Sequence, residues 1–267
     1  MVIERRLGID ANCLKGVSAK DALPLIAAAG FKSFFTDVYT PAEVAEVKKT
    51  ADSLGLAYTF IHAPFDKVNT FWLEGDAYRD LNDRIKISID SASQSEVPVV
   101  ILHLSSGWTP PPITDIGLAR FDALVEYAES KNVKVAFENL RVVGNVAYFA
   151  ERYENRDSVG FCYDNGHEHC YTKYVTWMDI FRERTLCTHI HDNFGRGVEK
   201  VGQPDLHLLP FEGTADFAKM MRKLDEYGYE GDLTLEVFNS TSPEYLKMSN
   251  EEFLSTCYER LVKISKM

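Results

Sequence analysis

The sequence predicts a single (β/α)8 barrel, an α/β fold also called a TIM barrel, over residues 1–267. Three observations support this fold. Short apolar runs rich in strand-forming residues recur about every thirty residues. Helical patterns separate most of these runs, with no linker or break in composition. A length of 267 residues is also normal for such a barrel. An open, doubly wound sheet is the alternative, but the G-x-G-x-x-G loop typical of its first strand is missing.

The apolar runs define eight expected strands. They cover residues 7–10, 33–37, 57–62, 99–105, 134–140, 159–164, 188–193 and 232–238. Between them, residues 40–55 carry clear helix signals, since Thr40 and Glu43 match a capping box and Gly55 suits a left-handed stop. Similar patterns predict helices that end at Gly30 and Gly228, and helices over residues 77–92, 117–132 and 176–183.

Composition argues against several classes of protein. The chain has 29 Lys and Arg against 40 Asp and Glu, which gives a net charge of −11. Such a surface repels polyanions and argues against a nucleic-acid partner. No apolar run is long enough to cross a membrane, and the N-terminus lacks the apolar segment of a signal peptide. Five cysteines without a C-x-x-C pair are typical of reduced thiols, so we expect a cytoplasmic protein.

Ionisable side chains gather at the carboxyl ends of the predicted strands. All seven histidines map there or to the loops just beyond: His62, His103, His167, His169, His189, His191 and His207. Glu138, Asp164 and Glu236 end strands five, six and eight, and Asp205 precedes His207. An unpaired carboxylate in an apolar strand is strongly disfavoured, whereas a divalent cation satisfies such groups. Because a barrel brings all these ends to one mouth, the sequence predicts a metal site there.

Single residues of this kind have structural explanations as well. A histidine at a strand end is more often a hydrogen-bonded structural residue than a ligand. His169 and His189 are interpreted in this way, although His189 shares its strand face with His191. The joint pattern, with so many such residues at one end of one barrel, favours the metal site.

Seven segments of the chain resemble a known family. They are "IHAPF", "ILHLS", "FEN", "CYDNGH", "HIHDN", "LEVFN" and the D-x-H…P-x-x-G-x-x-D element from Asp205 to Asp216. Their order and spacing resemble the xylose isomerase-like barrels, and the resemblance covers nearly the whole chain. That superfamily includes sugar and sugar-phosphate isomerases and epimerases, and metal-dependent apurinic-site endonucleases.

The resemblance implies a set of metal ligands. The principal site of the family would here be made by Glu138, Asp164, His191 and Glu236. The endonuclease branch binds two more metals, and the matching residues are His62 and His103, which share Glu138, and then His167, Asp205 and His207. The oxygen-rich principal set suits Mn²⁺ or Mg²⁺, and the surrounding imidazoles suit Zn²⁺.

The loops at the mouth favour an isomerase over a nuclease. An endonuclease needs a basic track for a bent duplex, but these loops are acidic or uncharged and offer only Arg196 and Lys200. They are aromatic instead, and these rings either form walls for a small polyol or merely cover the barrel mouth: Phe65, Phe71, Trp72, Trp108 and Phe194.

The sequence therefore predicts a metal-dependent isomerase or epimerase that acts on a small sugar, sugar phosphate or cyclitol by proton transfer through an enediolate. The alternative is an apurinic-site endonuclease-like phosphodiesterase, and a non-catalytic metal-binding barrel is disfavoured by the intact ligand set. Resemblance to the epimerases implies that Glu138 and Glu236 remove and return the proton, while His167 hydrogen-bonds the oxyanion. Arg141 either holds a phosphate or carboxylate or is a surface salt-bridge partner, and the second role is favoured.

Overall fold

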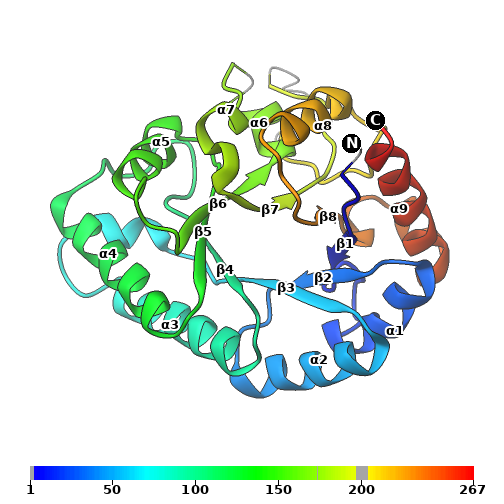
Figure 1. Cartoon of the computed structure of the whole chain (residues 1–267), viewed down its shortest axis with the longest axis horizontal. Coiled ribbons are helices and arrows are strands. Elements are labelled where there is room, and N and C mark those ends of the chain that lie inside the picture. The colour runs from blue at the N-terminus through cyan, green and yellow to red at the C-terminus, as the bar shows by residue number, and fades with distance from the viewer. Residues whose placement is uncertain (1–2, 173, 197–203) are drawn as a thin grey trace.

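The computed structural model describes residues 3–172, 174–196 and 204–267 and shows a barrel of parallel strands (Figure 1). Its strands are β1 (Leu7–Asp10), β2 (Ser33–Thr36), β3 (Ala57–His62), β4 (Val99–Leu102), β5 (Lys134–Glu138), β6 (Val159–Asp164), β7 (Thr185–His189) and β8 (Leu233–Leu235). They follow the order β7-β6-β5-β4-β3-β2-β1-β8. A bridge from Ile190 to Leu235 joins the two outer strands, so the sheet closes. The predicted (β/α)8 barrel is confirmed.

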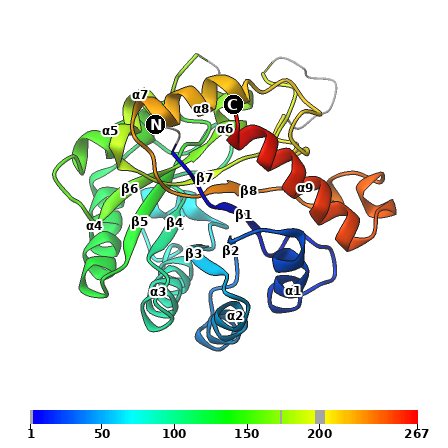
Figure 2. The ribbon, with the colours of Figure 1, turned by 45° about the vertical axis from the view of Figure 1, so that its right-hand side comes forward.

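Helices surround the strands on the outside. They are α1 (Ala19–Ala29), α2 (Pro41–Leu54), α3 (Arg79–Gln94), α4 (Asp115–Ser130), α5 (Val143–Arg152), α6 (Asn165–Tyr171), α7 (Met178–Phe181), α8 (Phe217–Glu226) and α9 (Asn250–Ser265). The last of them, α9, contacts both α1 and α8 and so completes the outer ring, as Figures 1 and 2 show. Within the described ranges, no helix is long and apolar enough to cross a membrane.

The helix stops were predicted well and one helix start was not. Gly30, Gly55 and Gly228 all have positive φ angles, as expected of residues that end helices. The capping box of α2 is wrong in detail, because the Thr40 hydroxyl bonds the Glu43 carboxylate and caps no backbone N–H. The helices α5, α6 and α9 were not among the predicted ones.

The seventh strand is displaced from its predicted position. It was expected over residues 188–193 but spans Thr185–His189, where it pairs with β6 from Phe161 to Asp164. Of residues 190–193, Ile190 forms a bridge to Leu235 of β8, and Asp192 pairs with Leu208 in the following loop. This difference of a few residues changes which histidine faces the barrel interior.

The inside of the barrel is filled by a small apolar layer that is separate from the larger core between strands and helices. It consists of Phe35, Phe60, Val99, Ile101, Ala136, Cys162 and Cys187. These residues come from β2 to β7, and each points inward. Since side chains alternate along a strand, the residue two positions later in each strand also points inward, at the carboxyl end.

Candidate metal centre at the barrel mouth

A ring of ionisable side chains lies directly above the apolar layer. The residue two positions after the last inward-facing one supplies such a side chain for each of β2 to β7. Asp10, which ends β1, and Glu236, which follows β8, complete the set. The ring consists of Asp10, Asp37, His62, His103, Glu138, Asp164, His189 and Glu236. Most of these side chains are buried. Burying so many ionisable groups together is costly unless they bind one another or a cation.

Glu138 is at the centre of the first group. Its Oε2 lies 2.7 Å from His103 Nε2 and 3.4 Å from His62 Nε2. The two imidazole nitrogens are only 3.2 Å apart. This is the group that the sequence predicted for a metal shared with the principal site, and its three members can each offer one ligand atom to one ion.

The second group contains Glu138, Asp164 and Glu236, but its histidine is His189. His189 Nδ1 lies 3.1 Å from Glu138 Oε1, 3.4 Å from Glu236 Oε2 and 3.9 Å from Asp164 Oδ2. The sequence predicts His191 in this group and a structural role for His189. His189 takes the place of His191 in this group because β7 ends earlier than predicted. His189 is the last inward-facing residue of the strand, and His191 lies beyond it.

His191 belongs to a third group at the outer edge of the ring. Its Nε2 lies 3.2 Å from Asp164 Oδ1 and 3.6 Å from Asp205 Oδ1. Its ring stacks on that of His207 with centroids 4.0 Å apart. His167 Nε2 approaches Asp205 Oδ2 at 3.1 Å. The structure thus brings together all nine predicted ligands and adds His189, whereas His169 bonds Thr214 instead and joins none of these groups.

The charges of these groups shift one another's pKa values. Burial would lower the pKa of His189, but the negative charges of Glu236 and Glu138 outweigh it and raise that pKa to about 10. Burial would also lower the pKa of His207, but the negative charges of Asp205 and Glu236 outweigh it and raise that pKa to about 9. Conversely, burial would raise the pKa of Glu138, yet His189 and His103 hold it well below its ordinary value. Glu138 is therefore favoured in its ionised form, and His189 and His207 in their protonated forms.

Orphaned polar atoms test whether these groups fit a metal. Among the described residues, Asp164 Oδ2, Asp205 Oδ1 and both ring nitrogens of His191 are buried without a hydrogen-bond partner. Such atoms are expensive to bury unsatisfied, and each is a normal metal ligand. The convergence of carboxylate oxygens and imidazole nitrogens fits a divalent cation.

Cation binding is expected to release protons. An imidazole must lose its proton to ligate a metal, and His189 and His207, with pKa values of about 10 and 9, are protonated at pH 7. Affinity for Mn²⁺ or Zn²⁺ should therefore rise as the pH increases from 6 toward 9. Isothermal titration calorimetry in buffers with different ionisation enthalpies measures the number of protons released. An affinity that does not change over this pH range would contradict ligation by these histidines.

Amide side chains connect the strand ends that carry the candidate ligands. Asn139, directly after Glu138, donates to the Asp164 carbonyl and accepts from the Asp164 N–H, both at 2.8 Å. Asn165, directly after Asp164, makes the same pair of bonds with His191, both at 3.1 Å. Sequence reasoning missed these positioning residues. The repeated signal was an asparagine that follows a strand-end carboxylate.

Asp192 of the "HIHDN" segment has a structural role and is not part of a metal group. Its carboxylate accepts hydrogen bonds from the backbone N–H groups of Phe211, Gly213 and Ala215. These bonds fix the loop that follows Asp205 and His207. The polar cluster at residues 187–193 therefore combines two histidines of the potential metal groups, His189 and His191, with an aspartate that anchors a loop.

The ring opens into a cavity of about 250 Å³ at the mouth. It is lined by His62, Phe65, His103, Ser105, Ser106, Glu138, Leu140, Arg141, His167, Asp205, His207 and Glu236. Of the five aromatic residues expected at the mouth, Phe65 lines this cavity. Its ring packs over that of His103, with the ring centroids 4.1 Å apart. Phe71 and Trp72 are fully buried against Phe121. The prediction that these two rings form a wall for the substrate is therefore wrong.

The first two strands contribute carboxylates that sequence reasoning missed. Asp10 ends β1 and Asp37 directly follows β2, where each continues the inward-facing pattern. Burial, assisted by the negative charges of Asp37 and Glu236, raises the pKa of Asp10 well above its ordinary value. The segments "GID" and "FTD" carried the same strand-end signal as "FEN" and "CYD".

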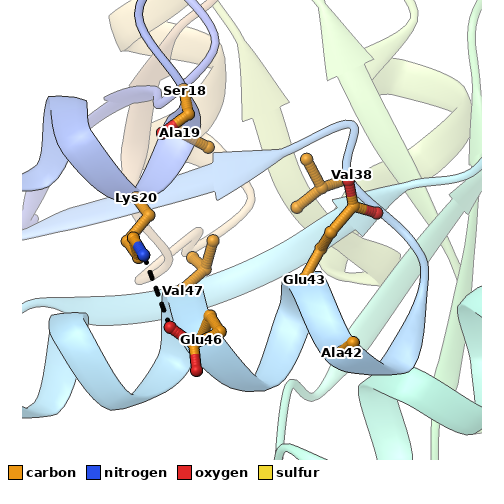
Figure 3. A pocket seen from close by; sticks show the side chains of 8 residues that line it. All are labelled: Ser18, Ala19, Lys20, Val38, Ala42, Glu43, Glu46 and Val47. Atoms are coloured by element: carbon orange, nitrogen blue, oxygen red, sulfur yellow. Dashed lines mark hydrogen bonds and ion pairs between the residues drawn. The ribbon is translucent and has the colours of Figure 1, made fainter.

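A second cavity of about 310 Å³ lies between α1 and α2 (Figure 3). It is lined by Ser18, Ala19, Lys20, Val38, Ala42, Glu43, Glu46 and Val47. Lys20 Nζ and Glu46 Oε2 are 3.4 Å apart on its exposed rim, and such pairs contribute little to stability. With no histidine in its lining and no orphaned polar atom among its side chains, this groove offers far less chemistry than the barrel mouth.

Comparisons with solved structures agree with the fold. A D-tagatose 3-epimerase-like protein is 20% identical with a TM-score of 0.72, and the match covers 98% of both chains. The IolI protein, crystallised with a zinc atom, is 18% identical with a TM-score of 0.77 and 98% coverage of both chains. D-Allulose 3-epimerase from Methylomonas sp., in complex with D-allulose, is 16% identical with a TM-score of 0.71, covering 98% of this chain and 99% of that one.

Comparisons of sequence identify the family. The uncharacterised protein y4fM of Sinorhizobium fredii is 30% identical over 166 residues, which are 57% of this chain and 51% of that protein. The chain thus spans about half the length of this relative. A model described as the xylose isomerase-like TIM barrel matches residues 23–256. The chain belongs to the xylose isomerase-like TIM barrel family.

Proposed function

We propose that this protein is a divalent-metal-dependent isomerase or epimerase of a small sugar, sugar phosphate or cyclitol. The observation that carries the proposal is the group of Glu138, Asp164, His189 and Glu236, whose ligand atoms all lie within 4.8 Å of one another at the floor of a small cavity. Structures with this fold include one named as an epimerase in complex with D-allulose and one named as holding zinc, and both names agree with the proposal.

Two glutamates would transfer the proton. When bound, a divalent cation polarises adjacent oxygens of the substrate and acidifies its C–H bond. Glu138 and Glu236 come from different strands and both line the cavity, so one carboxylate can take the carbon-bound proton and the other can return it. Glu138 Oε1 also lies 3.2 Å from His167 Nδ1, besides its contacts with three other histidines. Glu236 has fewer such contacts and is the more available base.

His167 fits the role of a ligand better than that of an oxyanion donor. Its Nδ1 lies 3.0 Å from the Asn139 carbonyl, to which it must donate, and its Nε2 faces Asp205. In the neutral ring this leaves a lone pair on Nε2 beside a carboxylate, and a cation between them resolves the repulsion. We therefore place His167 with Asp205 and His207 in an outer metal group.

The nuclease alternative is supported by one observation, the presence of three complete ligand groups. Against it, Arg141 is the one Lys or Arg in the cavity lining among the described residues, and Lys200 lies outside the described ranges. Binding of a bent duplex normally needs several phosphate contacts from cations. The small cavity fits a monosaccharide better.

Isotope exchange tests the proposed reaction. The metal-loaded protein is incubated with ketoses, aldoses and inososes in deuterated water, and NMR follows the loss of the carbon-bound proton. The expected result is exchange into one substrate class through an enediolate. A duplex with one abasic site is offered in parallel, and its nicking at catalytic protein levels, with no exchange into any sugar, would replace this proposal by the nuclease.

A further inference from the structure

We propose that Arg141 binds an anionic group of the substrate, so that the enzyme acts on a sugar phosphate or a sugar acid in preference to a neutral sugar. This inference rests on the proposed function, which supplies the statement that the substrate is a sugar. It names a specificity-determining residue that lies outside the metal groups. Arg141 follows β5 by three residues and lines the same cavity as Glu138 and Glu236.

Arg141 lines the cavity and, within the part of the chain that the structure describes, has no acidic partner there. Among the described residues, no carboxylate forms an ion pair with it, and its buried Nε has no hydrogen-bond partner. Several other arginines do have such a partner, as Arg84 has in Asp66 and Arg152 in Asp122. The surface salt-bridge role that the sequence favoured for Arg141 is therefore wrong. An unpaired guanidinium in a cavity wall is available to a ligand.

Two aromatic rings hold the guanidinium in position. Its carbon lies 4.0 Å from the centre of the Tyr171 ring and 5.7 Å from that of Trp108, and one Nη donates to the Tyr171 hydroxyl. Stacking of this kind fixes the plane of the guanidinium and reduces the entropy that it loses on binding. The Tyr171 hydroxyl in turn donates to Asp205 at 3.1 Å. Tyr171 therefore connects Arg141 to Asp205 of the outer metal group.

The surroundings favour an anion further. Arg196 also lies 5.7 Å from the Trp108 ring, which places a second positive charge at the same rim. Ser105 and Ser106 line the cavity with Arg141 and bring hydroxyl donors. A planar guanidinium matches the paired oxygens of a carboxylate or a phosphate, and such charge-assisted bonds are about twice as strong as neutral ones. We infer that the substrate lies with its polyol end at the glutamates and its anion at Arg141.

Binding of unreactive ligands tests this inference separately from catalysis. Xylitol, xylitol 5-phosphate and xylonate share a five-carbon skeleton, and none has the aldehyde or ketone that an isomerase requires. Calorimetry with Mn²⁺-loaded protein at fixed ionic strength measures their affinities. We expect one of the anions to bind about ten-fold or more tightly than xylitol. Which anion shows the preference distinguishes a phosphate from a carboxylate.

Variants assign the preference to Arg141. Arg141→Gln should abolish it while leaving xylitol affinity unchanged, and Arg141→Lys, which keeps the charge without the planar fork, should retain a part of it. Arg222→Gln removes the same charge from an exposed position on α8 and should change nothing. Equal affinities of the three ligands for the wild-type protein, no binding of either anion, or a preference that survives Arg141→Gln would each overturn the inference. Failure of isotope exchange alone would affect only the proposed reaction.

Discussion

Replacement of Glu236 by glutamine is expected to lower proton transfer by about 10²–10⁴-fold while the fold is kept. Glutamine is nearly isosteric with glutamate but cannot accept a proton. The backbone at this position is held by a hydrogen bond from the Glu236 N–H to the Ile190 carbonyl, which the change leaves in place. The measurement is the rate of deuterium exchange into the substrate identified by the panel.

Metal content and a control separate loss of the base from loss of the site. Glu236 Oε2 lies 3.4 Å from His189 Nδ1, so the variant must be assayed at saturating metal and its metal content measured directly. Glu230→Gln, at an exposed position before β8, serves as the matched control and should keep full activity. Full exchange by the Glu236 variant with metal bound would reject the acid–base role of Glu236.

Glu138, Asp164, His189 and Glu236 form the inner group of candidate ligands. Replacement of His189 by glutamine is expected to weaken metal binding by this group at least about 100-fold. Loss of a residue that merely orients a ligand already costs about 10- to 100-fold in affinity, so loss of a ligand should cost no less. His189 is fully buried and approaches three carboxylates, which makes it the central imidazole of the inner group. Competition titration with a chelator of known affinity measures the change.

His169 provides a control of the same residue type. It lies near the mouth, but its Nε2 bonds the Thr214 hydroxyl and it joins none of the potential metal groups within the described residues. His169→Gln should therefore retain wild-type metal affinity. If the two variants bound metal equally well, His189 would return to the structural role that the sequence suggested.

The barrel and most of the site were predictable because both depend on simple periodicities. Eight apolar runs with helical patterns between them are enough to predict the fold. Placement at strand ends or in the loops just beyond them, together with the family resemblance, identified nine of the ionisable residues that the structure brings together. Asp10 and Asp37 were also predictable from the same pattern, and they were missed because no resemblance drew attention to them.

The choice between His189 and His191 was not predictable from pattern alone. Both residues have the same parity, so alternation cannot distinguish them, and only the register of β7 against β6 shows which one ends the strand. The roles of Phe71, Trp72 and Arg141 were also out of reach. Whether a loop residue packs inward or faces a cavity depends on tertiary contacts that spacing does not encode.

The closure of the barrel at its last strand has a consequence for folding. Glu236 follows β8, which pairs with β1 and meets β7 through the Ile190–Leu235 bridge, so the inner group is incomplete until the two ends of the sheet have joined. Its partners are distant in sequence, and bringing them together costs loop-closure entropy that only the finished barrel repays. A cation bound by all four residues would therefore stabilise the closed barrel over any partly folded chain, and would hold β7 and β8 together where the sheet closes.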